Sequence, residues 1–126
     1  MKIPKELKYT KDHEWISLDG QIATVGITDF AQRELGDIVY VEVETVGEAL
    51  EADDVFGTVE AVKTVSDLFL PVAGEIIEFN DSLEDSPEDV NTAPYSKGWT
   101  IKLKVLNPND LNDLLDSDQY KELIGE

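Results

Sequence analysis

The most informative stretch of the chain is residues 57–67, which read GTVEAVKTVSD. Apolar and β-branched residues on both sides of its centre predict two strands joined by a tight turn at Lys63. Lys63 is the only basic residue between positions 51 and 67. A lysine at the tip of a stiff hairpin is well presented to a modifying enzyme. The spacing alone, however, favours an ordinary surface lysine paired with Glu60 or Asp67.

Similar strand patterns lie on both sides of this hairpin. The pair Asp19-Gly20 separates two apolar runs and predicts a hairpin with a type I′ turn. The expected strands are residues 15–18, 21–25, 37–43, 55–62, 65–72, 75–79 and 98–105. Many short strands with turn signals about every ten residues are typical of an all-β sandwich or barrel.

Short helices are expected around this β framework. Thr28 is suited to cap a helix over residues 29–35, which Gly36 would end. Leucines with helical spacing predict one or two more short helices in residues 111–124. The acidic segments 44–54 and 81–95 are expected to be connections, the second with one helical turn.

Composition restricts the classes of function. The 126 residues carry 28 Asp and Glu against 10 Lys and Arg, a formal net charge of −18, with no cysteine and one histidine. One domain over residues 1–126 is expected at this length. Without cysteine, the chain can form neither disulfides nor thiolate metal sites. Its single histidine argues against a Ser-His-Asp catalytic triad. Such a negative charge argues against nucleic acid and anionic membranes and favours partners with basic docking surfaces.

No targeting or membrane segment is visible in the sequence. The N-terminus runs directly into polar sequence, and no apolar run approaches the roughly 20 residues of a membrane span. We therefore expect a soluble protein of the bacterial cytoplasm, or of the mitochondrial matrix if this is a mature eukaryotic chain.

Seven motifs occur in order along most of the chain. They are residues 9–15 (YTKDHEW), 23–32 (ATVGITDFAQ), 35–39 (LGDIV), 57–63 (GTVEAVK), 71–75 (PVAGE), 83–87 (LEDSP) and 95–99 (YSKGW). On these motifs the chain resembles the H proteins of the glycine cleavage system nearly from end to end. That family has a β barrel-sandwich hybrid fold, as in lipoyl and biotinyl carriers, with short flanking helices. Ala61 stands where the family more often has serine, which leaves the neighbouring lysine unaffected.

The resemblance implies a non-catalytic carrier with lipoate in an amide bond on Lys63. Such a carrier takes the aminomethyl group of glycine from the glycine decarboxylase (P protein) to the aminomethyltransferase (T protein). It passes electrons to dihydrolipoamide dehydrogenase (L protein), and its lipoate is attached by lipoylating enzymes. The arm raises the effective concentration of a reactive group at successive active sites, whose enzymes supply the chemistry.

The same resemblance suggests roles for three acidic residues. Glu60 matches the position that helps lipoylating enzymes recognise the lysine. Glu14 matches a position at the cleft that shelters the loaded arm, and Asp67 is a weaker candidate there. An exposed strand position for Glu60, and solvated or hydrogen-bonded carboxylates for Glu14 and Asp67, remain open alternatives. His13 is interpreted as a turn or packing residue.

Other carriers match the sequence less well. Lipoyl domains of 2-oxo-acid dehydrogenases are shorter and usually present Asp-Lys-Ala, whereas this chain has Val62-Lys63-Thr64. Biotin carriers usually flank their lysine with methionines, and the only methionine here is Met1. A lipoate relay, which donates lipoyl groups to other carriers, is the alternative that the sequence separates poorly from glycine cleavage.

Overall fold

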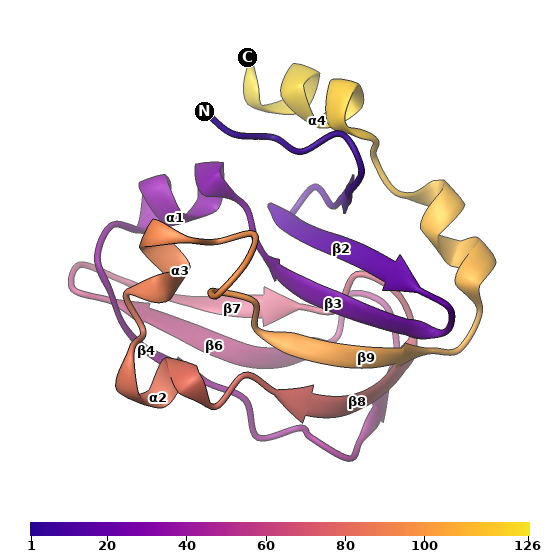
Figure 1. The fold of residues 1–126 in the computed structure, drawn as a ribbon, viewed down its shortest axis with the longest axis horizontal. Helices are drawn as coiled ribbons and strands as arrows, with labels where there is room; N and C mark the ends of the chain where they lie inside the picture. Colours follow the sequence, from indigo (N-terminus) through magenta and orange to yellow (C-terminus); the bar gives the residue numbers. More distant parts are fainter.

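A computed structural model describes all 126 residues of the chain, and two antiparallel sheets dominate it (Figure 1). The larger sheet has the strand order β1-β2-β3-β9-β8-β5 and the smaller one the order β4-β6-β7. The strands are β1 (Lys8–Tyr9), β2 (Glu14–Asp19), β3 (Ile22–Ile27), β4 (Ile38–Glu42), β5 (Ala49–Leu50), β6 (Val55–Ala61), β7 (Val65–Phe69), β8 (Gly74–Phe79) and β9 (Ile101–Val105).

The main hydrophobic core lies between the two sheets. Nineteen buried residues form it, most of them from alternating inward positions of both sheets, such as Ile16 and Val25 of the larger sheet and Val41 and Val59 of the smaller one. The short helices and connections contribute the others: Leu70, Val72, Leu83, Val90 and Leu111. The expected β fold, a barrel-sandwich hybrid with short flanking helices, is therefore confirmed.

Short helices surround the sheets, as expected. They are α1 (Asp29–Leu35), α2 (Ser82–Asp85), α3 (Asp89–Thr92), a 3₁₀ helix (Pro108–Asp113) and α4 (Ser117–Ile124). Thr28 caps α1 as predicted, because its hydroxyl accepts a hydrogen bond from the Ala31 N–H at 3.1 Å. No helix of the chain is long and apolar enough to cross a membrane.

A second, smaller core lies on the outer face of the larger sheet. Tyr9 and Tyr120 stack there with ring centroids 4.7 Å apart, so α4 closes over the N-terminal segment, and both termini lie together in Figure 1. Trp15 belongs to the same cluster and lies across from Gly26, where a Cβ would approach the indole nitrogen to 2.6 Å. Glycine is required at that position because the indole occupies the space of a side chain.

Several expected boundaries were wrong. Asp19 pairs with Ile22, so the hairpin turn is Gly20-Gln21; only Gly20 has positive φ, which fits type II′ rather than type I′. β7 ends at Phe69 because Leu70 turns to exchange backbone hydrogen bonds with residues 53 and 54.

Three further differences concern the connections. Residues 44–54 contain the two-residue strand β5, which pairs with β8. Residues 81–95 form two helical turns, α2 and α3, in place of one. The last strand begins at Ile101 rather than at residue 98.

Candidate functional site

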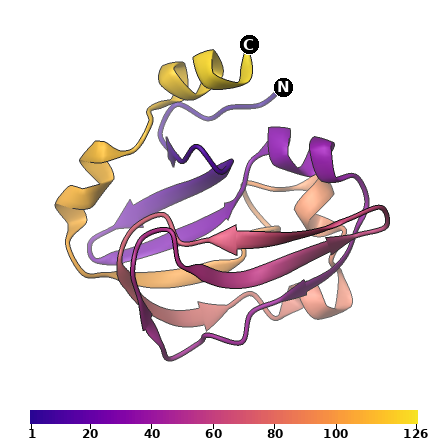
Figure 2. The ribbon, with the colours of Figure 1, turned by 180° about the vertical axis from the view of Figure 1, so that it is seen from behind.

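The hairpin of β6 and β7 presents Lys63 at its tip. Glu60 and Val65 form the last strand pair, and the Ala61 N–H donates to the Thr64 carbonyl at 2.7 Å, which closes the turn. The Val62 N–H donates to the carbonyl of Asp37 at 3.0 Å and ties the turn to the segment after α1. Figure 2 shows this hairpin projecting past the sheet, beside α1. The tip is thus exposed on a fixed base.

Lys63 has no ionic partner in this structure. The one ion pair of the chain joins Arg33 to Asp29, so Lys63 is paired neither with Glu60 nor with Asp67. Val62 and Val65, one and two residues away along the chain, are 75% and 63% exposed. The lysine is therefore flanked by apolar surface and free to be modified.

The end of α1 lies against the stem of Lys63. Gly36 ends the helix with φ 82°, and the Lys63 Cε lies 3.5 Å from the place that a Cβ on Gly36 would take. Asn91 fixes this connection, since its side-chain amide donates to the Gly36 carbonyl at 2.9 Å and its oxygen accepts from the Ile38 N–H at 2.9 Å. The segment that packs against the Lys63 side chain is thus held in place by hydrogen bonds.

A cleft of about 410 Å³ lies between α1, the start of β2 and the hairpin strand β7. Its β7 wall begins at Ser66, three residues after Lys63, which is roughly 10 Å of extended chain. Half of the residues that line it are apolar and none is Lys or Arg. They are Asp12, His13, Glu14, Ile27, Phe30, Ala31, Glu34, Leu35, Val59, Ser66, Asp67 and Leu68.

Glu14 is the buried acid of this cleft. It is 2% exposed, its Oε2 accepts a hydrogen bond from the Phe69 N–H at 2.7 Å, and its Oε1 has no hydrogen-bond partner. Burial raises the pKa of Glu14 well above its ordinary value, and the charges of Asp12 and Asp53 add to the rise. The Phe69 N–H and the nearby Thr10 hydroxyl act in the opposite direction. The Oε1 atom of Glu14 is the one buried side-chain polar atom of the chain without a hydrogen-bond partner.

The other predicted acids divide between the cleft and the outer surface. Asp67 lines the cleft and is exposed, so it lies at the rim with Glu14 further inside. Glu60 does not line the cleft; it is exposed and pairs with Tyr40 on one side and Val65 on the other. Residues that face each other across neighbouring strands share one face, so Glu60 lies beside the apolar surface of the hairpin.

Sequence reasoning missed how much His13 contributes. It adopts positive φ (67°) and packs against Phe30, with ring centroids 4.7 Å apart and ring planes tilted by 38°, which agrees with a turn or packing role, but it also lines the cleft. Its Nδ1 lies 2.9 Å from the Tyr120 hydroxyl, which lies 2.7 Å from the Thr28 hydroxyl. Burial lowers the pKa of His13. Helical spacing could have indicated that α1 forms a wall of the cleft. Four of the lining residues lie on one face of this seven-residue helix: Phe30, Ala31, Glu34 and Leu35.

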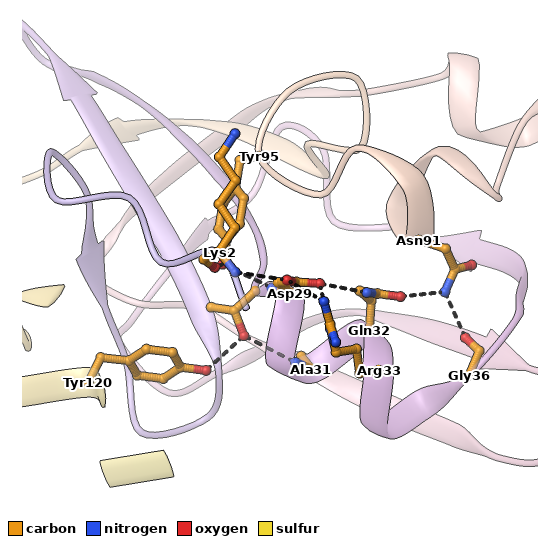
Figure 3. Close-up of polar contacts among 10 residues, drawn as sticks. Lys2, Asp29, Ala31, Gln32, Arg33, Gly36, Asn91, Tyr95 and Tyr120 are labelled. Atoms are coloured by element: carbon orange, nitrogen blue, oxygen red, sulfur yellow. Dashed lines mark hydrogen bonds and ion pairs between the residues drawn. The ribbon is translucent and has the colours of Figure 1, made fainter. Parts of the chain in front are cut away.

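The opposite face of α1 holds a polar network (Figure 3). Asp29 accepts hydrogen bonds from the Lys2 backbone N–H, the Gln32 amide and the Arg33 guanidinium, at 2.7 to 3.3 Å. Burial alone would raise the pKa of Asp29, but these donors outweigh it and lower the pKa. Gln32 also accepts from Asn91 at 3.0 Å. This network anchors the helix that walls the cleft.

The sequence and the fold of this chain are similar to those of known proteins. The family model described as glycine cleavage H-protein matches residues 7–126. Glycine cleavage system H proteins from Bacteroides fragilis and Chlorobium limicola are 58% and 62% identical, over 99% and 100% of both chains. The crystal structure of a glycine cleavage system H protein from Mycobacterium marinum superimposes with a TM-score of 0.89 at 38% identity, covering 98% of this chain and 100% of that one.

Proposed function

Because the chain belongs to the glycine cleavage H-protein family, we propose that it carries lipoate on Lys63 and moves the aminomethyl group of glycine between enzymes. Family membership supports the general role of a lipoyl carrier in glycine cleavage. The observation that supports Lys63 as the attachment point is its position at the tip of a rigid hairpin, without an ionic partner. A fixed tip gives an attaching enzyme one geometry to recognise, and the unpaired side-chain amine, once it has lost a proton, is available for amide formation.

The residues near Lys63 fit a lipoyl group. The cleft starts a few residues from the attachment point, has apolar walls for a hydrocarbon arm and contains the unpartnered oxygen of Glu14. When bound, lipoate would supply a disulfide that is reduced as it takes up the aminomethyl group and is restored by a later oxidation. The encoded chain supplies no thiol that competes with this disulfide, since it has no cysteine.

The chain's own residues would hold and shelter the cargo. Phe30 and Leu35 of α1 and Leu68 of β7 contribute apolar wall, which excludes the water that would hydrolyse an aminomethyl group. Glu14 provides a carboxylate for the cationic nitrogen, and a charge-assisted hydrogen bond in a buried place is strong. Asp67 adds negative charge at the rim. The chain thus acts by binding and exclusion, and partner enzymes perform the catalysis.

The partners follow from this role. We infer docking to the decarboxylase (P protein), the aminomethyltransferase (T protein), dihydrolipoamide dehydrogenase (L protein) and lipoylating enzymes, in a bacterial-type cytoplasm. The net charge of −18 favours basic docking surfaces on these proteins. Glu60, beside the exposed Val65, is proposed to help lipoylating enzymes recognise the hairpin. We treat residues 1–126 as a single lipoyl-carrier domain.

Intact mass tests the attachment point. Protein produced with a lipoylating enzyme and lipoate should gain one lipoyl increment, which Lys63→Arg should abolish while the circular dichroism spectrum stays unchanged. Lys97→Arg, at another exposed lysine, is the matched control and should keep the increment. A lipoyl increment on Lys63→Arg would overturn the assignment.

Glycine–bicarbonate exchange tests the role. Lipoylated protein should stimulate the exchange that purified glycine decarboxylase catalyses, and unmodified protein should not. Should lipoylated protein fail to stimulate exchange while donating lipoate to other carriers through an amidotransferase, the relay function would replace glycine cleavage.

A further inference from the structure

The cleft contains a carboxyl group that the fold does not neutralise. Glu14 is 2% exposed and receives one backbone hydrogen bond, and its second oxygen receives none. No lysine or arginine lines the cleft, and the chain's single ion pair lies elsewhere. An ionised carboxylate that is buried without a partner is very costly, so such a group takes up a proton instead.

The other charged groups around the cleft are acidic as well. Asp12 lies just before β2, Glu34 on α1 and Asp67 on β7, and all three line the same cleft. Asp53, in the connection before β6, also adds negative charge near Glu14. A nearby negative charge disfavours a further one inside the cleft. Burial raises the pKa of Glu14, and the charges of Asp12 and Asp53 add to the rise.

His13 is the only side chain in the cleft that could carry a positive charge, and its hydrogen bonds hold the imidazole neutral. The Thr28 side chain is fully buried and accepts from the Ala31 N–H, and its hydroxyl lies 2.7 Å from the Tyr120 hydroxyl, where either can donate. Because a buried hydroxyl needs an acceptor for its own proton, we assign the Thr28 proton to the Tyr120 oxygen. The Tyr120 hydroxyl then donates to His13 Nδ1, so the ring proton of the neutral imidazole lies on Nε2.

A second proton on His13 would disturb this chain of hydrogen bonds. It would sit on Nδ1 and reverse the Tyr120 hydroxyl, which would leave the buried Thr28 hydroxyl without an acceptor, at a cost of about 1–3 kcal/mol. Burial lowers the pKa of His13 further, although Asp12 and Glu34 act in the opposite direction. His13 therefore neither takes the proton of Glu14 nor supplies a cation to it.

We propose that Glu14 is protonated while no cation is docked in the cleft, and that it exchanges this proton for the ammonium group of the cargo. This inference rests on the proposed function, since it assigns the cleft to an aminomethyl cargo. The O–H bond of the Glu14 carboxyl breaks, its proton leaves to water, and the carboxylate pairs with the arriving ammonium. An amine that arrives unprotonated takes the same proton directly, and none is then released.

Proton exchange gives docking a defined pH dependence. Below the Glu14 midpoint, docking of an ammonium group releases one proton and therefore weakens about tenfold for each unit by which the pH falls. Above that midpoint the carboxylate is already ionised, and docking no longer depends on it. An acidic medium would thus favour release of the cargo from its shelter.

Carboxyl ¹³C NMR on the unmodified chain tests the protonated state without any lipoyl group. The resonance is assigned by its disappearance in Glu14→Gln, and Asp67→Asn, which changes an exposed acid of the same cleft, is the matched control. Glu14 should titrate at higher pH than the exposed glutamates. The single histidine should show the Nε2–H form. Titration of Glu14 together with the exposed glutamates, or an Nδ1–H imidazole, would overturn the proposal.

The exchange itself is tested on the lipoylated chain with and without cargo. Loading the aminomethyl group should lower the Glu14 midpoint below its value in the unmodified chain, whereas the lipoylated chain without cargo should keep the high midpoint. An unchanged midpoint on loading would overturn the exchange. A chain that cannot be lipoylated at Lys63 would instead contradict the proposed function, while the measurement on the unmodified chain would still stand.

Discussion

Two acidic residues on opposite sides of α1 have opposite environments. On one face, Asp29 accepts hydrogen bonds from Lys2, Gln32 and Arg33, and its pKa is lowered. Beyond the other face, Glu14 receives one backbone hydrogen bond and its pKa is raised. Asp29 is satisfied within the chain and serves to hold the helix. Glu14 has no charged partner within the chain, and its second oxygen has no hydrogen-bond partner.

Helical periodicity separates these two environments. Residues 29, 32, 33 and 36 lie on the anchored face, and residues 30, 31, 34 and 35 lie on the face that walls the cleft. The anchored face can therefore fix the position of the wall without adding positive charge to the cleft. The difference teaches that one short helix provides both a rigid support and a binding surface.

The largest effect is expected from Glu14→Gln in the loaded carrier. Replacing the carboxylate by an amide removes a charge-assisted hydrogen bond of about 2 kcal/mol, so the aminomethyl group should be lost roughly 30-fold faster. Formaldehyde release from purified loaded protein measures this rate. Asp67→Asn, at the exposed rim, should change it by less than about threefold. Equal rates for wild type and Glu14→Gln would remove Glu14 from the mechanism.

Asp29→Asn should act on stability instead. The amide no longer neutralises Arg33 and leaves the Lys2 and Gln32 donors poorly matched, so the free energy of unfolding should fall by about 1.5 kcal/mol. Urea unfolding at neutral pH provides the measurement. Arg33→Gln is the control: its guanidinium is largely exposed, so a smaller loss than for Asp29→Asn is expected. A larger loss for Arg33→Gln than for Asp29→Asn would contradict the anchoring role.

The two acids should impose opposite pH trends on the unmodified chain. Because the folded-state pKa of Glu14 is raised, its contribution to stability is present below about pH 4.3, the ordinary glutamate value, and is lost as the pH rises through the raised pKa. The pKa of Asp29 is lowered, so its contribution is present above about pH 3.9 and is lost as the pH falls.

Denaturation curves from pH 3 to pH 8 check these signs by difference. Wild type minus Glu14→Gln should decline toward alkaline pH, and wild type minus Asp29→Asn should decline toward acid pH. The slope should not exceed about 1.4 kcal/mol per pH unit for one proton. Difference curves that slope in the same direction would end the distinction between the two faces.

The smallest effect is expected from Tyr120→Phe. The ring keeps its stack on Tyr9, but the hydroxyl that links Thr28 to His13 is lost, and stability should fall by about 1 kcal/mol. The ¹⁵N shift of His13 Nδ1 should move toward the value of a nitrogen without a hydrogen bond. Tyr95→Phe, which contacts Lys2 and Asp29 on the anchored face, should leave that shift unchanged. No change in Tyr120→Phe would mean that α4 does not hold His13.

Local features of the molecule were predictable from the sequence, and its long-range contacts were not. The hairpin around Lys63 and the cap of α1 at Thr28 depend on neighbouring residues, whose patterns the chain displays directly. The one hydrogen bond of the Glu14 side chain comes from Phe69, 55 residues away, and the neutral form of His13 depends on Tyr120, 107 residues away. The strand β5 was missed because pairing with β8, rather than its own two residues, creates it.

The central claim, that an arm on Lys63 brings its cargo into the cleft beside α1, is tested most directly by NMR contacts. Protein lipoylated at Lys63 and loaded with a ¹³C-labelled aminomethyl group should show cross-relaxation from the labelled methylene to Phe30 and Leu35. The account predicts these contacts at neutral pH and their weakening in Glu14→Gln. Cross-relaxation to Val62 and Val65 of the hairpin tip alone, with none to α1, would contradict it.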